Sequence, residues 1–166
     1  MTATPEDHAE TDTAPRPAPG VAFLLTQLGT LAAGRFAERV GELGLSPPQV
    51  GLLRMIGAQP GLSQQALAAR LGLLPSKVVS FVDDLEQRGV VQRTRSKTDR
   101  RVYELELTAE GAALLGQVRE VAAAHESEFC AALDDEQHTE LRALLRRLAD
   151  SHQLTPGVHP GYRHLR

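Results

Sequence analysis

Residues 63–111 read SQQALAARLG LLPSKVVSFV DDLEQRGVVQ RTRSKTDRRV YELELTAEG, and this stretch decides the fold. A short helix is expected from the N-cap Ser63 to a tight turn at Gly72, because serine caps helix starts and glycine suits the left-handed turn that ends them. A second helix is expected from Pro75 to Gly89. Its apolar residues recur at intervals of three or four and so share one face: Val78, Phe81, Val82 and Leu85. Two helices joined by a short glycine turn form a helix-turn-helix.

The hydrophobic period changes after the second helix. Val90–Gln92 favour a strand, Arg93–Arg101 are polar and typical of a turn, and Val102–Leu107 alternate between apolar and polar residues. Two such strands joined by a loop predict a β-hairpin. Together with the two helices, this hairpin indicates a winged helix-turn-helix lobe over residues 46–107.

Positive charge is concentrated in this lobe. The whole chain carries a formal charge of −3, but residues 70–101 contain eight bases and four acids, so the remainder carries −7. Five of these bases lie in the predicted hairpin loop, against a single acid. Charge runs are often only solvated loops, but a basic module in an acidic protein is typical of a protein that binds a polyanion.

Helical patterns flank the lobe on both sides. An apolar stripe predicts a helix from about Val21 to Leu43, which contains three glycines and therefore needs packing partners to persist. Ser46-Pro47-Pro48-Gln49 predicts the start of the next helix, with a capping box. Downstream of the hairpin, Thr108 is expected to cap a long helix, and Asp134 with Gln137 to start the last one.

The composition agrees with a mainly helical protein. Of the 166 residues, 42% are hydrophobic and only 4% aromatic, which favours leucine- and alanine-rich helices over a sandwich or barrel. The single cysteine excludes an internal disulfide and any multi-cysteine metal site. No apolar run reaches the roughly 20 residues that cross a bilayer, and the N-terminus does not resemble a secretory signal, so a cytoplasmic protein is expected.

The two ends of the chain are rich in proline. Residues 1–20 contain four prolines and four acids but few large apolar groups, which predicts a disordered tail. Residues 156–166 are rich in proline, glycine, histidine and arginine, and we expect a loosely held C-terminal tail.

The residues after the second helix carry a family resemblance. Leu85-Glu86-Gln87-Arg88-Gly89-Val90-Val91-Gln92-Arg93 is followed by Asp99-Arg100-Arg101 and then by Leu107-Thr108-Ala109-Glu110-Gly111. In this combination and spacing, the chain resembles the multiple-antibiotic-resistance regulator (MarR) family of winged-helix transcription factors, from about Val21 to Leu154.

The resemblance implies a fold class and a function. The fold would be mainly α with a small β-hairpin: a winged helix-turn-helix lobe plus a helical dimerisation region formed by residues 21–45 and 108–155. The protein would be an obligate homodimer on a palindromic double-stranded DNA operator, with half-sites about one helical turn apart. It would be a transcriptional regulator, and we expect a repressor that a small aromatic or lipophilic ligand releases.

The recognition helix and the wing supply the expected DNA contacts. Pro75 would fix the start of the helix, and the polar residues near it project away from the apolar face. They would contact DNA there. The alternative is that they are ordinary solvated positions. The residues expected to contact DNA are Pro75, Ser76, Lys77, Ser80, Arg93, Arg95, Lys97, Arg100 and Arg101. By resemblance, Asp99 pairs with Arg101 and supports the wing. Asp84 would repel phosphate, so we expect it to face a cytosine, water or solvent.

By the same resemblance, an effector pocket lies between the DNA-binding lobe and the dimer helices. Its expected lining residues are Gln27, Arg35, Phe36, Met55 and His125, although a histidine packed in the core or an interface is the simpler interpretation of His125. Cys130 has no base adjacent in the sequence, which favours a buried, inert thiol over a redox switch. The histidines are scattered, so we expect no specific metal site and no cofactor.

The sequence contains no catalytic constellation. We find no Ser/His/Asp set with a local signature, no glycine-rich phosphate loop and no paired carboxylates in a plausible cleft, and we therefore expect no enzyme. The alternative is a non-regulatory interaction module, a helical dimer that uses its winged helix to bind protein. Such a module would need no run of five bases.

Overall fold

The structure is a computed structural model that describes residues 18–96 and 101–164. Most of the predicted tail at residues 1–20 lies outside this part of the chain, as do Lys97, Asp99 and Arg100 of the wing. The elements in chain order are α1 (Val21–Glu42), α2 (Pro47–Ala58), β1 (Leu62–Ser63), α3 (Gln64–Leu71), α4 (Pro75–Gln87), β2 (Val91–Arg95), β3 (Tyr103–Leu107), α5 (Ala109–Phe129), α6 (Asp135–Ser151) and the 3-10 helix η1 (Pro160–His164). The predicted mainly helical class with a small sheet is confirmed.

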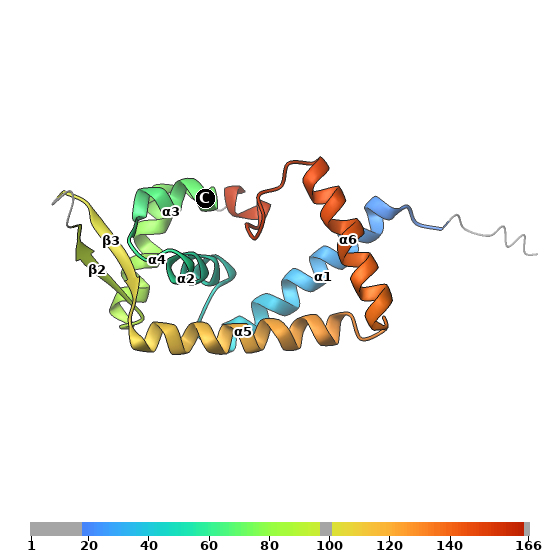
Figure 1. Cartoon of the computed structure of the whole chain (residues 1–166), viewed down its shortest axis with the longest axis horizontal. Coiled ribbons are helices and arrows are strands. Elements are labelled where there is room, and N and C mark those ends of the chain that lie inside the picture. Colours follow the sequence, from blue (N-terminus) through green and yellow to red (C-terminus); the bar gives the residue numbers. More distant parts are fainter. Residues whose placement is uncertain (1–17, 97–100, 165–166) are drawn as a thin grey trace, which may run out of the picture.

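The long helix α5 organises the molecule. Figure 1 shows α2, α3, α4 and the sheet gathered at one end of α5, whereas α6 follows its other end and α1 runs across it. In the described residues, no helix is long and apolar enough to cross a membrane. We call α2, α3, α4 and the sheet the lobe, and α1, α6 and the distal part of α5 the arm.

The helices begin at the residues whose side chains were expected to cap them. Ser46 and Gln49 form a capping box at α2, and Asp134 and Gln137 form another at α6. The Ser63 hydroxyl accepts from the Ala66 amide at 3.2 Å. These contacts satisfy N–H groups that a helix start leaves without backbone partners.

The sheet has three strands in the order β1-β3-β2, all antiparallel. Leu105 lies between Leu62 of β1 and Arg93 of β2. The sequence predicted only the hairpin, because two residues of β1 are too few for an alternating pattern to appear. The turn was also predicted to start at Arg93, but this was wrong: β2 continues to Arg95, which pairs with Tyr103.

The joint between the hairpin and α5 is unusually close. The Thr108 hydroxyl donates to the Gly89 carbonyl at 2.7 Å and accepts from the Gly111 amide at 3.0 Å. A Cβ atom on Gly111 would lie 1.9 Å from the Val90 carbonyl oxygen, so only glycine fits there. The Leu-Thr-x-x-Gly sequence thus packs the start of α5 closely against the residues that lead into strand β2.

The apolar stripe of α1 is divided. Phe36, Val40 and Leu43 pack on the core of the lobe, whereas Leu24 and Leu28 in the first half are 40% and 49% exposed. Near its C-terminal end α1 is fastened to α5 by an ion pair between Arg39 and Glu128, which lowers the pKa of the Glu128 carboxyl. The first half of α1 faces α6 across a groove, but its leucines remain 39–49% exposed in this single chain.

The end of the chain corrects an expectation. Residues 156–166 were predicted to be loosely held, but Val158 and Tyr162 pack against the core of the lobe. The Tyr162 hydroxyl donates to the Pro47 carbonyl at 2.8 Å, and burial raises the pKa of this phenol. A single aromatic ring in a polar segment is too short a pattern to reveal this docking from the sequence.

The docking of Tyr162 predicts a measurable contribution to stability. Tyr162→Ala should lower the free energy of unfolding by roughly 1–3 kcal/mol, because the ring leaves a partly buried site. Tyr162→Phe should lower it by roughly 0.5–1.5 kcal/mol, the typical loss for one hydrogen bond. Urea unfolding followed by circular dichroism measures both. Tyr103→Phe, which alters the 45% exposed tyrosine of β3, is the control and should change little. Equal stability of the Tyr162 variants and the parent would contradict the docked segment.

Candidate nucleic-acid interface

Helix α4 presents a polar face opposite its buried one. Val78, Val82 and Leu85 are completely buried, and α4 starts at Pro75, as predicted. Ser76 and Ser80 are exposed, and Lys77 is half-buried. The structure therefore places these three polar residues on the accessible side of a helix whose other side is fixed in the core.

Asp84 is exposed, which agrees with the expectation that it faces a cytosine, water or solvent, but it also has a partner inside the lobe. Its carboxylate accepts from the Gln49 side-chain amide at 2.7 Å. The oxygen of the same amide accepts from the Ser46 backbone N–H at 2.8 Å as part of the capping box. One buried glutamine thus links the start of α2 to α4 through the Asp84 carboxylate.

Arg93 differs from the other bases of the wing. Its guanidinium forms ion pairs with Asp83 and Glu86 on α4, and its side chain is only 19% exposed. In the amide orientation that satisfies both groups, the Gln64 oxygen accepts from the same guanidinium at 2.7 and 2.8 Å. Burial lowers the pKa of Arg93, but the hydrogen bonds and charges of Asp83 and Glu86 outweigh it, and the net shift is upward. This residue ties the wing strand to α3 and α4.

The remaining described bases of the wing are more accessible. Arg95 and Arg101 are both exposed, and the Arg95 guanidinium lies 5.5 Å from the centre of the Tyr103 ring. The predicted contacts of Lys97 and Arg100, and the Asp99–Arg101 pair, fall on or involve residues outside the described ranges. The exposed basic edge of the wing thus begins at Arg95, two residues beyond the base that braces it.

A cavity of about 720 Å³ lies between the lobe and α5. Apolar side chains of α1, α2 and α5 line it, including the expected Phe36 and Met55. Three arginines from three different helices also line it, and none of them was predicted: Arg54, Arg70 and Arg119. The docked C-terminal segment supplies a further wall through Pro156, Gly157 and Tyr162.

The other residues expected in this pocket lie elsewhere. His125 is stacked between Phe36 at 5.6 Å and Phe129 at 5.8 Å, measured between ring centres, which agrees with a packed histidine. Gln27 and Arg35 are exposed on α1 and do not line this cavity. They lie on the same helix as Phe36 but on its exposed side. The sequence alone does not show which side of this helix faces the cavity.

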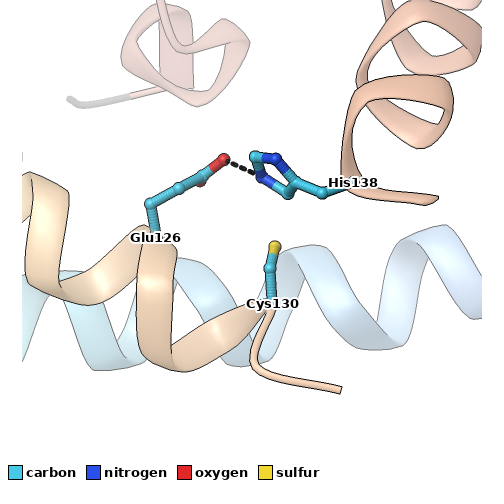
Figure 2. A group of neighbouring side chains, drawn as sticks. All are labelled: Glu126, Cys130 and His138. Atoms are coloured by element: carbon cyan, nitrogen blue, oxygen red, sulfur yellow. Dashed lines mark hydrogen bonds and ion pairs between the residues drawn. The ribbon is translucent and has the colours of Figure 1, made fainter. Parts of the chain in front are cut away.

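The environment of Cys130 also corrects the sequence analysis. Its side chain is half-buried rather than buried, and Glu126 and His138 lie beside it (Figure 2). The sequence suggested no neighbouring base, because the turn between α5 and α6 brings in a histidine from eight positions downstream. These three residues form the group of the described chain that could hold a metal ion.

A recognition-type helix beside a braced, basic hairpin defines a winged helix-turn-helix protein. The MarR family model matches residues 45–103. A protein of Thauera aromatica, named as a transcriptional regulatory protein for the hcr operon, is 36% identical over 130 residues, which cover 77% of this chain and 78% of the relative. The HTH-type transcriptional repressor Rv2887 of Mycobacterium tuberculosis is 30% identical over 126 residues, or 76% of this chain and 91% of the relative.

Solved structures of two similar proteins agree with the assignment to this family. The transcriptional repressor CouR bound to a 23-mer DNA duplex is 31% identical with a TM-score of 0.69, and the match covers 78% of this chain and 92% of that one. Rv2887 in complex with salicylic acid is 30% identical with a TM-score of 0.64, over 80% of this chain and 98% of that one. The chain belongs to the MarR family of transcriptional regulators.

The bracing role of Arg93 leads to a prediction about stability. Arg93→Ala should lower the free energy of unfolding by roughly 1–2 kcal/mol, because the largely covered guanidinium holds two carboxylates of α4. Arg35→Ala removes an exposed arginine of α1 and should change it by less than about 0.5 kcal/mol. Urea unfolding compares the two variants. An unchanged stability of Arg93→Ala would show that the pairs with Asp83 and Glu86 do not brace the wing.

Proposed function

We propose that the protein is a homodimeric repressor that binds a palindromic double-stranded DNA operator and releases it when a small aromatic or lipophilic anion occupies the cavity. The observation that carries this proposal is the exposed basic edge of the wing beside the accessible face of α4, in a chain that is otherwise acidic. A repressor acts where its operator is, so the proposed location is the cytoplasm. The proposal includes no catalytic step.

The geometry of the lobe supports the DNA contacts. Ser76, Lys77 and Ser80 are available to the major groove on one face of α4, and Arg95 and Arg101 extend from the neighbouring wing. We assign Arg93 a positioning role, because its charge is already taken up by two carboxylates. The DNA complex of CouR shows that a related repressor binds a duplex.

The arm supports the dimer. A groove of about 670 Å³ runs between α1 and α6, and its walls include Leu24 and Leu28 of α1. On α6 four leucines are 38–47% exposed in the single chain: Leu141, Leu144, Leu145 and Leu148. Such a large apolar surface on two adjacent helices favours burial against a second copy, as the resemblance implied.

The cavity supports the ligand. Its apolar walls suit an aromatic ring, and Arg54, Arg70 and Arg119 supply positive charge for a carboxylate. The salicylic acid complex of Rv2887 is a related protein with such a ligand. Because the cavity lies between the lobe and α5, a ligand there would favour one placement of the lobe over another.

The proposed DNA contacts predict the salt dependence of binding. Lys77→Ala and Arg95→Ala should each weaken binding to the promoter DNA of the protein's own locus, and each should reduce the salt slope by roughly one ion per protomer. Fluorescence anisotropy at several salt concentrations measures both quantities. Arg35→Ala, which removes the same charge from α1, is the control and should bind like the parent. Binding that is equal in all four proteins, or absent at low salt, would contradict the proposal and favour the protein-interaction module.

The proposed ligand site predicts a difference between arginines. Arg54→Ala and Arg119→Ala should each weaken the binding of salicylate, taken as a test compound, by about tenfold or more, since a charge-assisted hydrogen bond contributes about 1.5–3 kcal/mol. Arg35→Ala should bind salicylate like the parent, because Arg35 lies outside the cavity. Isothermal titration calorimetry measures the affinity. Loss of salicylate binding in Arg35→Ala alone would contradict the proposed cavity and favour the pocket residues expected from the sequence.

A further inference from the structure

Three potential metal ligands meet where α5 turns into α6. The Glu126 Oε1 atom lies 2.9 Å from the His138 Nε2 atom. The ligand atoms of Glu126, Cys130 and His138 all lie within 4.8 Å of one another. Figure 2 shows the Cys130 side chain pointing from the end of α5 toward the Glu126–His138 pair. This group lies in the arm, outside the DNA-binding lobe and outside the ligand cavity described above.

The backbone holds these positions without help from an ion. Glu126 and Cys130 are four residues apart, so they share one face at the end of α5, and the Cys130 amide donates to the Glu126 carbonyl at 3.0 Å. The connection is short because the Leu133 amide donates to the Cys130 carbonyl at 2.9 Å. The capping box at Asp134 then fixes the first turn of α6, which carries His138.

We propose that Glu126, Cys130 and His138 form a binding site for Zn²⁺. A carboxylate, a thiolate and an imidazole are the three kinds of ligand that zinc accepts in proteins. In a tetrahedral site, the ligand atoms would lie about 3.3–3.8 Å apart, given zinc–ligand distances of about 2.0–2.3 Å. The Glu126–His138 separation of 2.9 Å is shorter than this range, and no pair of the three ligand atoms is more than 4.8 Å apart, so the ion would need small side-chain adjustments to enter. A water molecule or a group of the second copy completes the coordination.

A metal ion bound here would take the place of the Arg142 guanidinium beside Glu126 and His138. This guanidinium lies 3.4 Å from both the Glu126 carboxylate and the His138 ring. The Arg142 side chain is 55% exposed, so it can turn into the solvent when a cation arrives. In the metal-free protein, Arg142 holds the ligands together. In the metal-bound protein, it would repel the ion.

The site has a structural consequence for the arm. The same residues line one side of a hollow of about 540 Å³ whose other walls include Leu25 and Leu28 of α1 and Leu141 of α6. An ion bridging α5 and α6 would fix the angle between these helices next to the surface proposed to bind the second copy. Zinc would thus stabilise one geometry of the dimer.

The test uses the untagged, metal-free protein without DNA, titrated with Co²⁺ and then with Zn²⁺. Co²⁺ should bind one ion per protomer and produce the near-ultraviolet band of a cobalt–thiolate bond, and Zn²⁺ should displace it and raise the melting temperature. Cys130→Ser should abolish the band, and His138→Gln should weaken binding by at least about tenfold. Arg142→Gln should strengthen binding severalfold, whereas a group that is only an ion-pair cluster predicts no such gain.

The control is His152→Gln, which alters a histidine at the end of α6 outside the group and should bind metal like the parent. Circular dichroism of the metal-free variants confirms that each folds. Absence of the thiolate band in the parent, or equal affinity in the parent and in Cys130→Ser and His138→Gln, would overturn the proposal. Because no DNA is present, this result is independent of whether the protein is a repressor.

Discussion

The close contact between Gly111 and the Val90 carbonyl is the constraint on which the rest of the molecule depends. Since no Cβ atom fits there, the first turn of α5 lies directly against the start of the wing strand. The Thr108 hydroxyl reinforces this contact, because it donates to the Gly89 carbonyl before β2 and accepts from the Gly111 amide in the first turn of α5. The start of α5 is therefore tied to the residues that lead into the wing strand, so a change in the direction of α5 would be felt by the wing.

The charges of the lobe fall into two functional groups. Arg93 pairs with both Asp83 and Glu86, and these contacts hold the wing against α4. Asp84 is likewise held by Gln49. The bases that remain on the surface, Arg95 and Arg101 among those described, are then presented by a rigid support. The acidic residues of α4 thus have partners inside the lobe, Arg93 for Asp83 and Glu86 and Gln49 for Asp84.

The sequence predicted the helices and their starts well, because caps and period are local properties. Ser46, Ser63, Thr108 and Asp134 each act within three residues of themselves, and the structure confirms them all. The order of helices and hairpin follows from these starts. The two-residue strand β1 was missed because its pairing partner lies some forty residues away.

The candidate sites were less predictable, because they are assembled by long-range packing. Arg54, Arg70 and Arg119 reach one cavity from three helices, and nothing in their local sequence sets them apart from solvated arginines. The role of Arg93 required knowledge of where α4 lies relative to β2. The proximity of His138 to Cys130 was not predicted, because it depends on the turn that places the start of α6 beside the end of α5.

The docked segment around Tyr162 lies at the cavity and away from the charged edge of the wing. It forms a wall of the cavity, and the hydrogen bond of its Tyr162 hydroxyl is to Pro47 of α2 rather than to the proposed DNA-contacting residues. If the cavity takes the proposed ligand, substitutions between residues 156 and 162 would change which ligand fits without altering the residues proposed to contact DNA. In the proposed repressor, ligand preference and DNA preference would then be encoded in separate parts of the chain.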